Sequence, residues 1–211
     1  MRKAYDILSR AGYTWDKPPI NDDGEIVTAS GIRLPNGESM ERFTILTPPA
    51  DYDPHRAISG LMIQEWVRDI GMPGFSRPMA FSSLLQQVKG RHDFDTFILG
   101  YGRLSMDPDY LRIFFLSGND KPRGWNMSGY RNPDFDTVAT ESSQAMDLEK
   151  RQALVREMQE IVLRDVPYYP IYDPLLIEAV RTDRFTGWVK MLEGIGNIWS
   201  FTQLKPVSQE S

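Results

Sequence analysis

Phe94-Asp-Thr-Phe-Ile-Leu-Gly-Tyr-Gly-Arg103, followed by Leu-Ser-Met-Asp-Pro-Asp-Tyr110, is a short apolar strand that runs into glycines and an aromatic residue. The stretch then meets Asp107-Pro108, a helix-start signal, because aspartate caps helices and proline fits their first turn. Side chains on such a loop are held at the end of a strand, where ligands usually bind in α/β proteins. The stretch therefore indicates an α/β fold with a binding site on this loop.

A second stretch of the same kind, Gly124-Trp-Asn-Met-Ser-Gly-Tyr130, stands just before Asn132-Pro133, another helix start. Tyrosine and tryptophan offer large rigid faces with one polar handle, and arginine offers a forked donor. Glycines beside them allow backbone to approach a ligand closely. The alternative is that Trp125 and Tyr101 pack in a core and Arg103 is solvated. The candidates for ligand contact are Tyr101, Arg103, Ser105, Trp125 and Asn126.

Apolar periodicity and cap signals predict an alternation of strands and helices along the chain. The expected strands are 42–47, 75–80, 94–99, 168–172 and 175–181, and the expected helices are 4–11, 54–70, 82–89, 108–115, 133–144 and 148–164. Residues 13–40 are expected to be loop, and helix 54–70 is expected to turn inward Met62, Ile63, Trp66, Val67 and Ile70. The fold class is therefore α/β, with a mixed sheet that contains 43–47, 94–99 and 168–172 and is flanked by helices 54–70 and 148–164.

The composition excludes several classes of protein. The 211 residues carry a net charge of −5 with lysines and arginines scattered, which argues against nucleic-acid binding. The absence of cysteine excludes disulfides and thiolate chemistry, and no apolar run is long enough to span a membrane. The chain begins almost inside a helix, so we expect it to be a fragment of a longer protein.

The residue inventory contains no catalytic or metal-binding constellation. The two histidines, His55 and His92, are expected to be solvated surface residues. Asp134 and Asp136 point away from each other on a helix, and Asn21-Asp-Asp-Gly24 matches only half of a calcium loop. No nucleophile elbow, phosphate loop or zinc-protease motif is present. We therefore expect no enzyme, no cofactor and no metal, while an enzyme of unknown type on an α/β scaffold stays open as the alternative.

Five strings of residues, taken in order, carry a resemblance to a known family. They are Ala11-Gly-Tyr-Thr-Trp15, His92-Asp-Phe-Asp-Thr-Phe-Ile-Leu-Gly-Tyr-Gly102, Gly129-Tyr-Arg-Asn-Pro-Asp-Phe-Asp136, Arg151-Gln-Ala-Leu-Val-Arg-Glu-Met-Gln-Glu-Ile-Val162 and Pro167-Tyr-Tyr-Pro-Ile-Tyr172. Nearly the whole chain resembles the C-terminal lobe of the extracytoplasmic solute-binding proteins of peptide and nickel ABC transporters, family 5.

The resemblance implies a periplasmic-binding-protein type II-like C-terminal lobe, here as a fragment. Residues 1–183 would form the ligand-binding lobe, and residues 184–211 would cross back toward an N-terminal lobe that this chain lacks. The two lobes would close on a peptide or other small solute and deliver it to a membrane permease. The protein would be periplasmic or at the cell surface. A sensing or chaperone role for the same lobe stays open.

One departure from the family bears on the ligand. Peptide-binding members usually carry Gly-Trp-x-x-Asp after the strand, and the aspartate pairs with the amino terminus of the peptide. Here the run is Gly100-Tyr-Gly-Arg-Leu104, so Tyr101 takes the aromatic position and Leu104 the acidic one. A leucine cannot pair with an ammonium group, and a buried unpaired charge is costly. The identity of the ligand is therefore open, and Arg103 could favour an anionic group instead.

Overall fold

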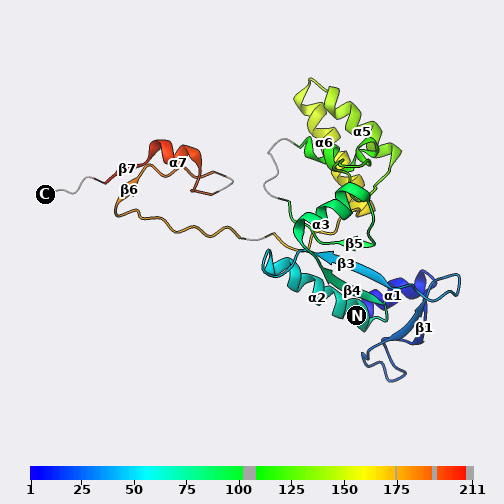
Figure 1. Cartoon of the computed structure of the whole chain (residues 1–211). Coiled ribbons are helices and arrows are strands. Elements are labelled where there is room, and N and C mark those ends of the chain that lie inside the picture. Colours follow the sequence, from blue (N-terminus) through cyan, green and yellow to red (C-terminus); the bar gives the residue numbers. More distant parts are fainter. Residues whose placement is uncertain (102–107, 174, 192–193, 208–211) are drawn as a thin grey trace.

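The computed structural model describes residues 1–101, 108–173, 175–191 and 194–207. Its central sheet has the strand order β4-β3-β5, with β3 at Phe43–Thr47, β4 at Gly74–Pro78 and β5 at Thr96–Phe97 (Figure 1). Both pairs are parallel, and Leu46 lies opposite Arg77 on one side and Phe97 on the other. The expected strands at 43–47, 75–80 and 94–99 are thus confirmed as members of one sheet, with β5 shorter than expected.

The connections between these strands lie on opposite faces of the sheet. Helix α2, Pro54–Asp69, joins β3 to β4, whereas α3, Phe81–Leu85, and the π-helix η1, Gln86–Arg91, join β4 to β5. Leu46 faces α3 and η1 in a buried cluster, and its neighbour Thr47 faces α2. Because the chain moves from β3 to one side and then returns to the other, a topological switch point lies between β3 and β5. Open α/β sheets bind ligands at the carboxyl end of this point.

Helix α2 begins as the sequence predicts, since the Asp53 carboxylate accepts a hydrogen bond of 3.0 Å from the Arg56 N–H. It approaches the sheet closely at Gly60, where a Cβ would stand 2.5 Å from Thr47 Cγ2. This approach turns the small residues inward, so the expected inward face is wrong in part. Met62 and Trp66 are exposed, by 43% and 58%.

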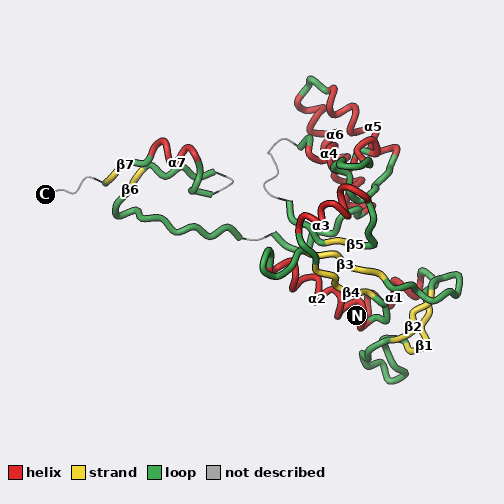
Figure 2. The backbone as a smooth tube through the Cα atoms, in the orientation of Figure 1, coloured by secondary structure: helices red, strands yellow, loops and turns green. Residues whose placement is uncertain are grey.

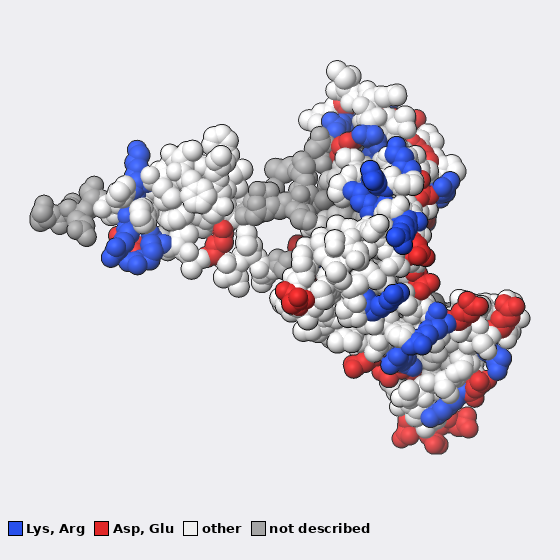
Figure 3. Space-filling model, viewed as in Figure 1, with Lys and Arg blue, Asp and Glu red and all other residues white. Residues whose placement is uncertain are grey.

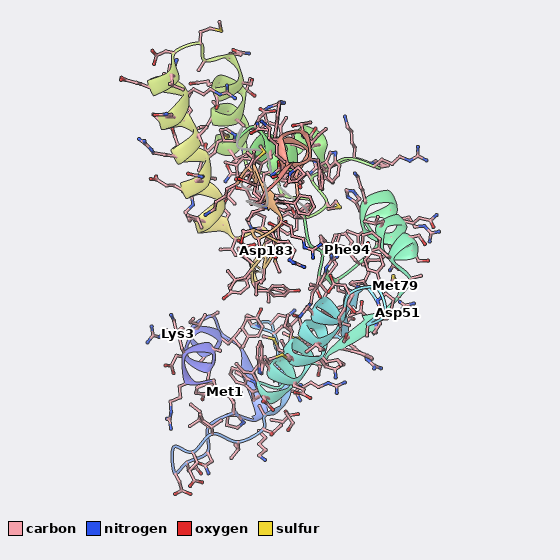
Figure 4. The ribbon with its side chains drawn as sticks, turned by 90° about the vertical axis from the view of Figure 1, so that its left-hand side faces the viewer. Met1, Lys3, Asp51, Met79, Phe94 and Asp183 are labelled. Atoms are coloured by element: carbon pink, nitrogen blue, oxygen red, sulfur yellow. The ribbon has the colours of Figure 1, made fainter. Side chains whose placement is uncertain are left out.

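The outer edge of β4 is closed by a side chain of α2. Gln64 Oε1 accepts a hydrogen bond of 2.9 Å from the Ser76 N–H, which points away from β3. The loops that follow β3 and β4 lie together at the carboxyl end, where Tyr52 stacks on Phe81 at 4.4 Å. Figure 4 shows the labelled Asp51 beside Met79 at this end.

A helical unit stands beside the sheet. It consists of α4, Tyr110–Phe115, the short 3-10 helix η2, Ser117–Asn119, α5, Pro133–Gln144, and α6, Leu148–Asp165. Asn132 and Asp147 cap α5 and α6 as predicted. The expected packing of 148–164 on the sheet is wrong, because α6 packs on α5. Its buried residues join a separate cluster of Leu111, Phe115, Phe135, Val138, Ala139, Met158 and Ile161.

The N-terminal region contains two strands that the sequence did not indicate. Helix α1 spans Arg2–Arg10, and Gly12 follows its C-cap with a φ of +92°, as expected. The expected loop 13–40 contains an antiparallel pair, β1 at Thr14–Lys17 and β2 at Ser30–Arg33. This pair is fastened to the end of α2 by Trp15, whose Nε1 donates to the Ile70 carbonyl at 2.7 Å. Most residues between 13 and 40 are polar or are turn residues, so their pattern does not predict strands. The strands depend on the contact of Trp15 with α2, which the sequence does not show.

The described residues from 175 onward extend away from the rest of the structure, and we call them the arm (Figure 1). The described residues up to 173 are the body. Its regular elements are β6, Phe185–Thr186, α7, Ile198–Gln203, and β7, Lys205–Pro206, and β6 pairs with β7 (Figure 2). The expected strands 168–172 and 175–181 are wrong, since no described residue of either range is in a strand. Their composition favours strands, but no neighbouring strand accepts their hydrogen bonds. Leu175 and Ile177 are 89% and 88% exposed.

The described residues contain no helix that is both long and apolar enough to cross a membrane. On the face shown in Figure 3, lysines and arginines are scattered among acidic residues, and the surface around α7 is mostly uncharged.

Candidate ligand-binding site

Tyr101 emerges from β5 at the carboxyl edge of the sheet, where the sequence placed it. Its ring lies 4.5 Å from that of Phe114, and its hydroxyl lies 3.3 Å from the hydroxyl of Tyr168. Burial and the neighbouring Tyr168 raise the pKa of Tyr101 above its ordinary value, so the hydroxyl stays protonated. The residue still keeps 38% of its surface exposed. Tyr101 is therefore positioned by its neighbours and partly open to a ligand.

Trp125 lies on the loop between η2 and α5 and extends the same aromatic surface. Its ring centroid is 5.9 Å from that of Phe114, and 47% of its surface is exposed. Lys89 Nζ stands 3.2 Å from the centroid of the Trp125 ring. The loop is fastened to η1, because the Arg123 N–H donates to the Lys89 carbonyl at 2.9 Å. We call the connected rings of Tyr168, Tyr101, Phe114 and Trp125 the aromatic row.

Asn126 is placed differently from its neighbour Trp125. Its side chain is completely buried and its amide donates to the carbonyls of Leu116, at 3.2 Å, and Tyr130, at 2.8 Å. Its oxygen accepts from the Tyr130 N–H at 3.1 Å. These bonds use the amide within the fold, so Asn126 shapes the loop that presents Trp125.

Three candidates from the sequence, Arg103, Leu104 and Ser105, lie outside the described residues. The described part of the chain stops at Tyr101 and resumes at Pro108.

Sequence reasoning missed three contributors to this surface, Lys89, Phe114 and Tyr168. Phe114 lies on the predicted helix 108–115, but nothing in its spacing distinguishes a ligand wall from a core position. Tyr168 was expected in a strand, yet it contacts Tyr101 and Phe97. Lys89 is 36 positions from Trp125 in the chain, and only the fold brings the two together. None of these contacts is local, so no sequence signal could have found them.

Arg56 also lies at the carboxyl edge, on the first turn of α2. Its Nη2 stands 3.2 Å from the point where a Cβ on Gly100 would lie, so the guanidinium group approaches the chain closely just after β5. Its Nε pairs with Asp53 at 2.7 Å. Its Nη1 is buried and has no hydrogen-bond partner among the described residues.

The two histidines differ from each other. His55 is exposed as expected. The expectation for His92 is wrong, because its side chain is only 23% exposed and Nδ1 lies 3.1 Å from Asp120 Oδ1. Asp120 also pairs with Arg131 at 2.6 Å, which links the turn before β5 to the loop of Trp125. Among the described residues, no group of histidines and carboxylates could hold a metal ion.

No family model matches the chain. It is 26% identical over 137 residues to the "Di/tripeptide-binding protein 4" of Pseudomonas aeruginosa, which covers 64% of this chain and 25% of that protein. It is 29% identical over 96 residues to the "Peptide transport periplasmic protein SapA" of Haemophilus influenzae, covering 46% of this chain and 16% of that protein. The chain therefore spans about a quarter or less of these curated relatives.

Solved structures share the fold over a larger part of the chain. The periplasmic oligopeptide-binding protein of an oligopeptide ABC transporter from Thermotoga maritima matches with a TM-score of 0.69 and 20% identity, over 98% of this chain and 39% of that one. The oligopeptide-binding protein AppA from Bacillus subtilis, in complex with a nonapeptide, matches with a TM-score of 0.65 and 23% identity, over 79% and 30%. These comparisons confirm the resemblance inferred from the sequence: the chain is similar to peptide-binding and peptide-transport proteins over part of their length, and it shares the α/β fold of solved oligopeptide-binding proteins.

Proposed function

We propose that this chain forms one wall of the binding cleft in a solute-binding protein of an ABC importer. The whole protein would capture a peptide or other small solute outside the cytoplasm, between two lobes, and deliver it to a membrane permease. The names of the two curated relatives support this proposal, because one is a di/tripeptide-binding protein and the other is a periplasmic protein of peptide transport. Those relatives are binding proteins, which agrees with the lack of a catalytic constellation in the sequence.

The observation that carries the proposal is the position of the aromatic row. Tyr101 leaves β5 at the switch point of the parallel sheet, and Trp125 continues the same surface from a different loop. Both rings are partly exposed, although aromatic rings of this size usually pack inside a domain. We assign ligand contacts to Tyr101 and Trp125, with Arg103, Leu104 and Ser105 on the loop that follows Tyr101 and Asn126 supporting Trp125 from behind.

The proposed division of the chain follows from the same geometry. Residues 1–183 hold the sheet, the helical unit and the aromatic row, and residues 184–211 would contact the second lobe. The arm supports this reading because α7 exposes Ile198, Trp199 and Phe201, by 70%, 55% and 68%. Trp188 and Ile195 are partly buried within the arm. The residues that remain exposed are enough for an apolar contact surface.

The test is the loss of solute binding when Trp125 is replaced by alanine in the protein in its full natural form. Calorimetry with a mixture of di- to hexapeptides would measure the affinity. Removing the aromatic contact should weaken binding by about 1–3 kcal/mol, or roughly fivefold to 150-fold. Trp66→Ala is the matched control, because Trp66 is similarly exposed but lies on the outer face of α2. Equal affinities for the parent and the Trp125 variant would refute the assignment.

A further inference from the structure

Lys89 differs from the other partly buried cations in the described part of the chain. Arg33, Arg56 and Arg112 each pair with an aspartate, at 3.0, 2.7 and 2.8 Å. Arg151 interacts electrostatically with Asp109. No described carboxylate lies within 4.0 Å of Lys89 Nζ, and its contact is the face of Trp125. The ammonium group is thus held near the aromatic row without a counter-charge.

The contact with Trp125 does not supply the counter-charge that Lys89 lacks. A cation over the face of an indole ring gains a modest electrostatic attraction, which replaces only part of the solvation that an ammonium group loses when it is partly buried. Burial lowers the pKa of Lys89 below its ordinary value, which reports the same loss of solvation. A carboxylate that reached the ammonium group would restore the missing interaction. Charge-assisted hydrogen bonds of this kind are among the strong ones.

We propose, as a deeper reading of the proposed function on which it rests, that Lys89 binds a carboxylate group of the solute. The carboxylate would lie at the Trp125 end of the aromatic row, and the apolar part of the solute would lie along Phe114 and Tyr101. The site then selects solutes by a negative group at one end.

A carboxylate can come from the C-terminus of a peptide or from an acidic side chain, and three sets of tetrapeptides separate these sources. The first set has free C-termini and no acidic side chains, the second has the same sequences as C-terminal amides, and the third consists of amides with one internal glutamate. Native mass spectrometry on the protein in its full natural form would rank the affinities. We expect the free acids to bind about tenfold to a hundredfold more tightly than the plain amides.

Three variants assign this preference to Lys89. Lys89→Met removes the charge but keeps an unbranched apolar chain over Trp125, and should lower the affinity for free acids to that for amides. Lys89→Arg keeps the charge and should retain most of the preference. Arg91→Met is the matched control, because Arg91 is an exposed cation on the same π-helix, and it should leave the preference unchanged.

The outcomes separate this inference from the proposed function. Equal binding of all three sets by the parent protein would overturn the role of Lys89. This comparison needs no variant, so it holds even if Lys89→Met fails to fold. Equal weakening of acids and amides by Lys89→Met would also overturn it, since the lysine would then only support Trp125. Tight binding of the third set would support the carboxylate and assign it to a side chain. If no set binds, the proposed capture of peptides fails, and the assignment of Lys89 to a peptide carboxylate falls with it.

Discussion

Strand β3 of the central sheet and the run 175–181 of the arm are equally strand-like in sequence, but only β3 forms a strand. Phe43–Thr47 pairs on both sides, and its Leu46 has no exposed surface. The run 175–181 is just as rich in leucine, isoleucine and valine, yet Ile177 is 88% exposed and no described residue there is in a strand. Strand propensity measures how well a side chain fits a pleated and half-buried surface. No described strand pairs with residues 175–181, so their side chains have no such surface to pack on.

The largest expected effect is the contrast in stability between these two regions. Leu46→Ala removes a fully buried side chain and should lower the free energy of unfolding by about 2–5 kcal/mol. Ile177→Ala changes an exposed side chain and should alter it by less than about 0.5 kcal/mol. Urea unfolding followed by circular dichroism measures both. A similar cost for the two variants would mean that the arm packs on the body in solution.

Self-association should also separate the two regions. The arm exposes Ile198, Trp199 and Phe201 on one short helix, and clustered apolar side chains of this kind favour contact between molecules. We expect the 211-residue chain to self-associate, and the double substitution Ile198→Ser with Phe201→Ser to reduce this association. Sedimentation velocity across concentrations is the measurement. A chain that stays monomeric at every concentration would contradict the expectation.

The helix caps offer a smaller and more local contrast. Asn132 caps α5 in the body, where its side chain accepts from the N–H groups of Asp134 and Phe135, and Asn197 caps α7 in the arm. Asn132→Ala should cost about 0.5–2 kcal/mol of global stability. Asn197→Ala should increase hydrogen exchange within the arm while the unfolding midpoint of the body stays the same. A lowered midpoint in the Asn197 variant would show that the arm and the body unfold together.

The smallest effect concerns acid. Tyr130, Asn132 and Arg164 lower the pKa of Asp165 from 3.8 to about 2. A carboxyl group whose pKa is lower in the folded state than in the unfolded state stabilises the fold at pH values above its ordinary pKa of 3.8. This contribution is lost as the pH falls toward 2. Asp165→Asn should therefore reduce the loss of stability between pH 4 and pH 2. Asp183→Asn in the arm is the control and should leave the acid unfolding curve of the body unchanged.

The sequence predicted best what depends on neighbours along the chain. Asp53, Asn132 and Asp147 mark helix starts correctly, because a cap bonds to an N–H only two or three positions away. Strand pairing and helix orientation depend on distant partners, so the strands at 168–181 were wrong and the inward face of α2 was wrong in part. Gly60 sets which face of α2 turns toward the sheet, because α2 approaches Thr47 closely at this residue. The periodicity of apolar residues does not reveal this approach.

The candidate site divides in the same way. Tyr101 and Trp125 could be proposed from the sequence because glycines flank them on loops between regular elements, and this signal lies within a few residues. Lys89 and Tyr168 were missed because each meets the aromatic row across a long stretch of chain. Local chemistry thus proposes where a ligand could touch the chain, and the fold supplies the remaining partners.

The hydrogen bond from the Ser76 N–H to Gln64 has a consequence for how the sheet can grow. An edge strand with unpaired N–H groups is a template onto which further strands can add, in the same molecule or in an aggregate. At β4 the side chain of α2 already occupies this position, and Pro78 at the end of the strand has no N–H to offer. Addition of a strand is therefore disfavoured on the β4 side, and β5 forms the other edge of the sheet.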